Sequence, residues 1–145
     1  MKKTISSPFT IIFKFIFTTG WIVGFGVATM SPLLSQGFSE NTLIFGSVWI
    51  LGSIFLFLYL SQMKKVEMDK DKIYVSNYFK TIEINKSEIS DVTENIYLNF
   101  HPVWIHLNKT TEFGDKIMFM PSIRFMAYFT PHPTVEELKD FANIK

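Results

Sequence analysis

A run of twenty residues without a charge, Thr42 to Ser61, constrains the fold of this chain more than any other stretch. A helix of this length extends roughly 30 Å at about 1.5 Å per residue, which matches the hydrocarbon core of a bilayer. The run contains twelve Leu, Ile, Val and Phe residues and stops just before Lys64 and Lys65. The sequence therefore predicts a transmembrane helix over about residues 42–62.

A second uncharged run, Phe15 to Leu34, lies before it and predicts another transmembrane helix over about residues 9–34. We expect this helix to begin near Ser7 and Pro8, because proline is tolerated in the first helical turn. A signal peptide is the rival interpretation, since lysines precede the apolar run, but the run is longer than a usual signal core. The two spans are joined by a short polar loop, so they should form a helical hairpin.

The distribution of lysine predicts how this hairpin is oriented. Three lysines lie before the first run, the connecting loop has none, and Lys64 and Lys65 follow the second run. Cytoplasmic flanks of transmembrane helices carry an excess of lysine and arginine, so we expect both termini in the cytoplasm. Neither run contains an acidic residue, a basic residue or a histidine, which argues against an ion pathway built by this chain alone.

Composition excludes several kinds of site. The chain contains no cysteine, so it has no disulfide, thiolate metal site or cysteine nucleophile. Positive and negative residues alternate over 64–72 instead of forming a basic face, so we do not expect nucleic-acid binding. His101 and His106 are five residues apart on a predicted strand and should point to opposite faces, which disfavours a paired metal site. We expect no metal and no cofactor.

Three carboxylates, Glu88, Asp91 and Glu94, lie close together in the sequence, and paired carboxylates can serve as acid and base. A solvated turn is the favoured interpretation. The sequence contains no nucleophile with a nearby base, no glycine-rich phosphate loop and no metal motif. We therefore expect that the protein is not an enzyme.

Small residues mark helix surfaces where another helix can approach closely. Gly20 and Gly24 have GxxxG spacing in the first span, which is less apolar than the second. We favour packing of this glycine face against the second span, because a short hairpin forces the helices together; docking onto another membrane protein is the alternative. The candidate helix-packing residues are Gly20, Gly24, Gly26, Gly46 and Gly52.

From Val66 onward the pattern changes to the alternation that is typical of half-buried strands, with turn residues between them. The run 117–120 is apolar throughout, as expected for a strand covered on both faces. A capping box over Thr134–Glu137 and one apolar face predict a C-terminal helix over about 134–143. The apolar positions expected to share a strand face are Ile73 and Val75, Ile82 and Ile84, and Val103, Ile105 and Leu107.

Two of these stretches resemble known proteins. Residues 72–89, KIYVSNYFKTIEINKSEI, resemble the opening of bacterial pleckstrin-homology-like domains, with a tyrosine-containing strand and a polar-x-x-Glu-Ile step. Residues 102–121, PVWIHLNKTTEFGDKIMFMP, are similar to the later hairpin of small bacterial membrane proteins that pair two spans with such a domain, and 132–138 resemble their C-terminal helix start. The resemblance covers about residues 66–142. It implies a partly open β-barrel with a C-terminal helix, held at the bacterial inner membrane.

Two stretches of this domain are candidates for outside contacts. Lysines near the first β-hairpin could contact anionic lipid headgroups: Lys64, Lys65, Lys70, Lys72 and Lys80. The segment 118–133 is rich in methionine and aromatic residues but is interrupted by prolines. Packing within the domain is favoured for it, and contact with a partner or the bilayer is the alternative. Its candidate surface residues are Arg124, Phe125, Met126, Tyr128 and Phe129.

These features predict a membrane α+β protein, with a transmembrane helical hairpin over 1–63 and a small antiparallel pleckstrin-homology-like sheet or partial barrel over 64–145. We expect a non-enzymatic, multi-pass inner-membrane protein that presents the domain in the cytoplasm as a protein-interaction or scaffold module. The alternatives are an accessory subunit that docks through its glycine-rich first span and a sensor of anionic lipid headgroups. The expected partners are the bilayer and another membrane or cytoplasmic protein, or a second copy of the chain.

Overall fold

A computed structural model describes residues 2–97, 101–122 and 130–144. The chain forms two compact units: unit 1 consists of Met1–Thr10 and Gln62–Lys145, and unit 2 consists of Ile11–Ser61. This division differs at the N-terminus from the expected one, which assigned residues 1–63 to the hairpin. The first ten residues fold with the C-terminal part of the chain, because they pair with one of its strands.

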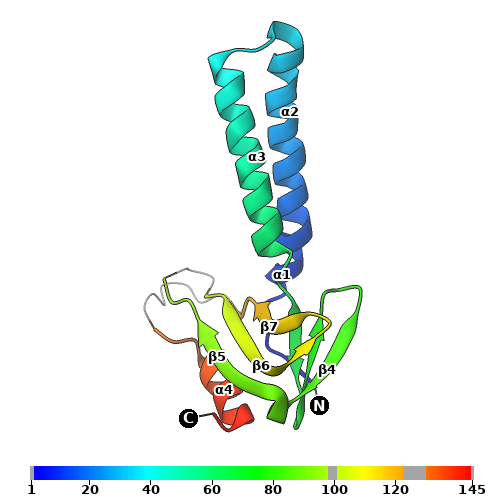
Figure 1. Ribbon diagram of the computed structural model, residues 1–145, viewed down its shortest axis with the longest axis vertical. Coiled ribbons are helices and arrows are strands. Elements are labelled where there is room, and N and C mark those ends of the chain that lie inside the picture. The colour runs from blue at the N-terminus through cyan, green and yellow to red at the C-terminus, as the bar shows by residue number, and fades with distance from the viewer. Residues whose placement is uncertain (1, 98–100, 123–129, 145) are drawn as a thin grey trace. The chain divides into compact units, whose positions relative to one another are not determined.

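Except for Phe9 and Thr10, the two long apolar helices that the sequence predicts belong to unit 2 (Figure 1). The first continues from α1 (Phe9–Ile11) through one π-helical stretch, η1 (Ile12–Phe17), into α2 (Thr18–Gln36), and the second is α3 (Glu40–Leu60). Both are long and apolar enough to cross a membrane. Ser39 begins α3 with a capping box, since its hydroxyl accepts from the Thr42 amide at 3.2 Å and the Thr42 hydroxyl accepts from the Ser39 amide at 2.8 Å.

Unit 1 begins with a four-stranded antiparallel sheet in the order β1-β2-β3-β4. Its first strand comes from the N-terminal segment before the helices, and its register pairs Lys3 with Met68 and Thr4 with Glu67. The other three strands follow the second helix as a meander. The strands are β1 (Lys3–Thr4), β2 (Lys65–Met68), β3 (Lys72–Ser76) and β4 (Thr81–Asn85).

A second antiparallel sheet follows in the order β5-β6-β7, and the short η2 (Lys86–Glu88) joins the two sheets. Its strands are β5 (Ile89–Glu94), β6 (Val103–Thr111) and β7 (Gly114–Phe119). Helix α4 (Pro133–Ala142) lies beside β5 (Figure 1). Two isolated bridges connect the first sheet to the end of β7. Ser6, just after β1, pairs with Pro121, and Met63, just before β2, pairs with Met118. The antiparallel meander and the terminal helix are thus confirmed.

The core of unit 1 lies between the sheets and α4, and the alternation in the sequence predicted most of it. The positions 73 and 75, and 103, 105 and 107, are buried, as is the whole run 117–120. Burial of such aliphatic side chains contributes about 1.5 to 3 kcal/mol each. The buried cluster comprises Ile5, Val66, Ile73, Val75, Ile84, Ile89, Val92, Val103, Ile105, Leu107, Ile117, Phe119, Val135 and Leu138.

Helix α4 lies where the sequence predicts a helix, but the predicted capping box is wrong. The N-cap is His132, whose Nδ1 accepts from the Thr134 amide at 3.1 Å, and Pro133 occupies the first helical turn. Proline suits that position because its missing N–H would have no partner in the helix and its φ angle is already helical. The helix therefore starts one residue before the threonine that was expected to cap it.

Acid will weaken unit 1 partly through Glu67 on β2. Its carboxylate lies 2.7 Å from Lys65 Nζ, and the hydrogen bond from Lys65 holds the pKa of Glu67 below its ordinary value of 4.5. A lowered folded-state pKa adds stability above pH 4.5 that is lost as the pH falls through the folded pKa. Because the pair is partly exposed, the effect is small, about 1 kcal/mol or less. Urea unfolding of Glu67→Gln should show a shallower loss of stability below pH 4.5 than the wild type does.

Candidate functional site

The two helices of unit 2 pack through a reciprocal pair of tryptophan and glycine contacts. Trp49 of α3 lies over Gly26 of α2, where a Cβ atom would be 3.2 Å from Trp49 Cζ2. In the other direction Trp21 of α2 lies over Gly52 of α3, where a Cβ atom would be only 2.6 Å from Trp21 Cζ2. Trp49 Nε1 also donates to the backbone oxygen of Ile22 at 3.1 Å. Each glycine makes room for a ring from the other helix.

The Gly20 and Gly24 face takes no part in this packing, contrary to the favoured expectation. A Cβ atom at either position would meet nothing within 4 Å, whereas one at Gly46 would lie 3.5 Å from the Thr29 methyl group. The bulky Trp21 ring occupies the space beside Gly52. Helix α2 therefore contacts α3 through Trp21 and not through the face that carries Gly20 and Gly24. Of the five predicted packing glycines, three serve the hairpin and two remain on an open surface.

An apolar groove runs along this open face of α2. It has a volume of about 580 Å³ and is lined by Phe17, Gly20, Trp21, Gly24, Phe25, Ala28 and Phe45. Gly20, Gly24 and Ala28 form the floor of the groove. They are spaced four residues apart and therefore share one face of the helix. The Trp21 and Phe25 rings stack with centroids 4.1 Å apart and form an aromatic wall. We call this feature the α2 groove.

The chemistry of the α2 groove is that of a packing surface. Its lining includes no acid, base or nucleophile, so it cannot catalyse a polar reaction or hold an ion. Small residues in such a stripe let a second helix backbone approach closely. Sequence reasoning found Gly20 and Gly24 but missed Ala28, although its spacing of four from Gly24 was visible. Phe45 could not be found from the sequence, because its approach depends on how α3 packs.

The five candidate headgroup lysines do not form one cluster. Lys70 lies in the β2–β3 turn, and Lys72 follows it at the start of β3. Lys65 and Lys80 lie at the other end of these strands, because Ser76 pairs with both Lys65 and Thr81. Several of these lysines are already paired with carboxylates. The ion pairs are Lys65–Glu67 at 2.7 Å, Lys72–Glu83 at 2.9 Å and Lys80–Glu112 at 2.6 Å.

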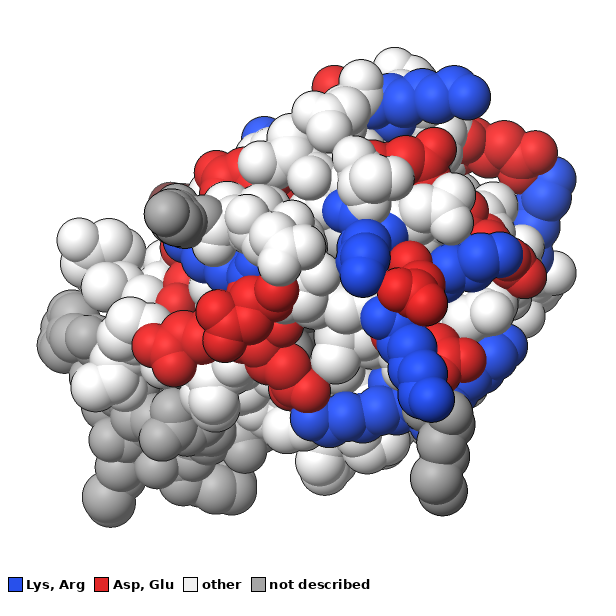
Figure 2. All heavy atoms as spheres, turned by 90° about the horizontal axis from the view of Figure 1, so that it is seen from below, with Lys and Arg blue, Asp and Glu red and all other residues white. Residues whose placement is uncertain are grey.

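Lys64 is the fifth candidate, and its backbone amide donates to Met118 O at 2.8 Å. Burial lowers the pKa of Lys64 from its ordinary value, because desolvation disfavours the charged form. Figure 2 shows the face of unit 1 seen from below in the view of Figure 1, where positive and negative side chains are intermixed. One group of acidic side chains lies together on that face, whereas the basic side chains drawn there are interspersed with acidic ones.

The partly buried Glu94 and two buried histidines form a polar cluster where β5 ends. The Glu94 carboxylate accepts from the His132 amide at 3.0 and 3.1 Å, and its Oε2 lies 3.7 Å from His101 Nδ1. Both ring nitrogens of His132 are hydrogen-bonded. Nε2 shares a hydrogen bond with Ser122 O at 3.0 Å, and Nδ1 accepts from the Thr134 amide. Within the described ranges no group of three His, Asp or Glu side chains could hold a metal ion. The cluster ties the start of α4 to the end of β5.

The other two carboxylates of the predicted trio bind elsewhere. Glu88 accepts from the Asn85 amide at 2.9 Å in the capping box of η2, and Asp91 Oδ1 accepts from the Val92 amide at 2.7 Å. Each of the three thus has a separate local role, and the structure assigns them no joint site. The predicted partner surface at Arg124, Phe125, Met126, Tyr128 and Phe129 lies outside the described residues.

Comparison with protein-family models, with curated proteins and with solved structures finds no match for this chain.

Proposed function

We propose that this chain is a two-span integral membrane protein with both termini in the cytoplasm. Its two apolar helices are 28 and 21 residues long, which is enough to cross a bilayer. Pairing of β1 with β2 requires the segments before the first helix and after the second to lie on the same side of the membrane. The lysines on both flanks and their absence from the connecting loop favour the cytoplasmic side of the membrane. The resemblance to small bacterial membrane proteins favours the inner membrane of a bacterial cell.

Unit 1 is then a pleckstrin-homology-like domain on the cytoplasmic surface. The described residues form seven strands in sheets of four and three, followed by a terminal helix. This arrangement agrees with the partly open barrel and C-terminal helix that the resemblance implies. The first strand comes from the N-terminal segment, so the membrane hairpin is inserted within the domain, between β1 and β2.

The function we propose is that of a non-enzymatic accessory subunit, which docks a transmembrane helix of a partner membrane protein in the α2 groove. The observation that carries this proposal is the open space above Gly20 and Gly24, in a hairpin whose other interface glycines are all covered by side chains. In lipid, helix association depends on close packing, and a groove floored by small residues offers it. Unit 1 is thereby presented beside the partner as an interaction module. We do not propose sensing of anionic headgroups, because the candidate lysines are divided between two ends of the sheet.

Substitution of leucine for Gly24 tests this docking directly. The new side chain enters open space within the protein, so the hairpin stays folded, but it fills the floor of the groove. A clash of about 1.4 kcal/mol would lower the association constant about tenfold. We expect the membrane protein that co-purifies with the intact wild type in mild detergent to be largely lost from Gly24→Leu. The amounts are compared by quantitative mass spectrometry.

The matched control is Val27→Leu, which adds apolar bulk on the same helix at an exposed position outside the groove. This variant should retain the partner. If Gly24→Leu retains it equally well, the groove is not the docking surface. If the wild type proves to be a dimer by light scattering and Gly24→Leu a monomer, the occupant is a second copy of the chain instead of a different protein.

A further inference from the structure

One end of unit 1 is defined by the two points where the chain passes to and from the helices. The N-terminal segment leaves at Thr10, which is fully buried, and the chain returns at Gln62. Next to these points, the Ser7 amide donates to Met120 O at 2.7 Å and the Lys64 amide donates to Met118 O at 2.8 Å. Both connections therefore lie beside the last residues of β7. We call this the exit end of unit 1.

Strand register places two loops at the exit end. Ser76 pairs with both Lys65 and Thr81, so the β3–β4 turn, 77–80, projects there. The Tyr78 side chain in this turn lies next to Thr10, where the chain leaves the unit. In the second sheet Val103 pairs with both Glu94 and Phe119, so the β5–β6 loop also starts at this end.

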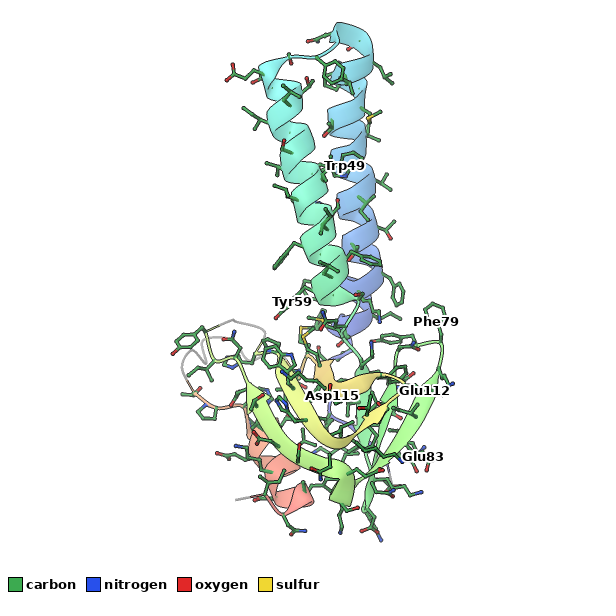
Figure 3. The ribbon with its side chains drawn as sticks, viewed as in Figure 1. Trp49, Tyr59, Phe79, Glu83, Glu112 and Asp115 are labelled. Carbon is green, nitrogen blue, oxygen red and sulfur yellow. The ribbon has the colours of Figure 1, made fainter. Side chains whose placement is uncertain are left out.

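Exposed aromatic side chains gather on these segments. Among the described residues of unit 1, the large hydrophobic side chains that are exposed are Phe9 at 47%, Phe79 at 86% and Tyr97 at 77%. Phe9 precedes Thr10, Phe79 lies at the tip of the β3–β4 turn, and Tyr97 lies in the β5–β6 loop. Figure 3 shows Phe79 above Glu83, which lies in the middle of β4. We call these three residues the aromatic rim.

The opposite end of the sheets is charged. The β2–β3 turn is formed by Asp69, Lys70 and Asp71, and Lys86 of η2 pairs with Asp71 at 3.0 Å. Aromatic side chains at one end and charged side chains at the other suit a domain that contacts a bilayer with the first end and water with the second. Aromatic side chains are favoured at the level of the lipid headgroups, whereas desolvating a charge is costly.

We infer that the aromatic rim inserts into the bilayer interface and holds the exit end of unit 1 against the membrane. This inference rests on the proposed membrane hairpin, because the hairpin keeps the exit end within reach of the lipid. The occupant is the lipid surface itself, contacted through apolar rings. Recognition of anionic headgroups is not required, since Lys80, next to Phe79, is paired with Glu112.

Site-directed spin labelling of the full chain in phosphatidylcholine nanodiscs tests this inference. The chain has no cysteine, so single cysteines can be introduced without removing others. The labelled variants are Phe79→Cys and Tyr97→Cys in the rim, Lys70→Cys at the charged end and Leu51→Cys in α3. Collisions with oxygen, which concentrates in lipid, are compared with those of a water-soluble nickel complex. We expect the ratio of oxygen to nickel collisions to be much higher at 79 and 97 than at 70.

The four positions separate the ways in which this inference can fail. If position 51 shows lipid contact but 79 and 97 resemble position 70, the rim does not insert, although the hairpin spans the membrane. If position 51 itself resembles position 70, the proposed membrane hairpin is wrong. If insertion at 79 and 97 appears only when anionic lipid is added, headgroup charge controls the contact, and insertion through apolar rings is refuted. Lipid contact at 79 and 97 in both membranes supports the inference.

Discussion

Replacement of Gly52 by leucine is expected to force the two helices of unit 2 apart. A Cβ atom at this position would lie 2.6 Å from Trp21 Cζ2 and 3.3 Å from Trp21 Nε1. The indole cannot move aside freely, because it stacks on Phe25. Overpacking of this kind costs about 1 to 3 kcal/mol, which is large for a hairpin of two helices. Spin labels at Val23 and Leu51 should report a longer and broader distance distribution in Gly52→Leu than in the wild type.

Two further variants distinguish steric conflict from a general effect of leucine. Gly24→Leu, on the open face, should leave the distance distribution unchanged. In the double variant Trp21→Ala/Gly52→Leu the added side chain fits the space that the indole leaves, so we expect a narrower distribution than in Gly52→Leu alone. Such non-additivity is the mark of two residues in direct contact. Equal broadening in the single and double variants would show that Trp21 is not the obstacle.

Removal of the N-terminal segment is expected to unfold unit 1, although this segment is separated from the rest of the unit by the whole hairpin. Ile5 is 5% exposed and belongs to the core, and replacing a buried isoleucine by alanine costs about 2 to 5 kcal/mol. The Ser6 hydroxyl accepts from the Val66 amide at 3.0 Å, and the Ile5 amide donates to Val66 O at 3.1 Å. Small domains are stable by only about 5 to 15 kcal/mol, so loss of this side chain together with the strand's hydrogen bonds removes a large share of the free energy that keeps unit 1 folded.

A circular permutant provides the test. Residues 62–145 are expressed alone and with residues 2–10 joined after residue 145 by a flexible linker, and urea unfolding of the two is compared. The ion pair between Lys3 and Glu137 shows that β1 lies close to α4, so a short linker suffices. We expect cooperative unfolding of the permutant and little or no folded structure in 62–145. A permutant with Ile5→Ala should be intermediate. Equal stability of the two chains would refute the role of the N-terminal strand.

The same result bears on the design of partner searches. A fragment that starts at residue 64 lacks β1, so failure of such a fragment to retain a partner would reflect an unfolded domain as much as a missing surface. The permutant separates these explanations, because it keeps all the described strands of unit 1 without the membrane helices. Partner recovery by the permutant would point to unit 1, and recovery by the intact chain alone would point to the α2 groove.

The sequence alone could not predict which glycine face of the helical hairpin is covered and which is left open as the α2 groove. The GxxxG spacing of Gly20 and Gly24 is a local pattern and was visible, but whether that face is covered depends on which rings enter the interface. Trp21 and Trp49 decide this by packing on Gly52 and Gly26, at sequence separations of 31 and 23 residues. Likewise, the separation of the candidate lysines into two ends follows from strand register, which no single stretch of sequence specifies.

By itself the sequence determined the two apolar helices, most of the strands after residue 65 and the terminal helix, because these elements depend on periodicity within a few residues. It missed β5, since Asp91 and Glu94 of this strand were expected in a solvated turn. Only the tertiary structure decided that residues before the first helix form a strand of unit 1. Lys3 and Thr4 are too few to show a period, and their pairing with β2 spans more than sixty residues. Burial of Ile5 and backbone hydrogen bonds to Val66 hold this strand in place, and neither leaves a local signal.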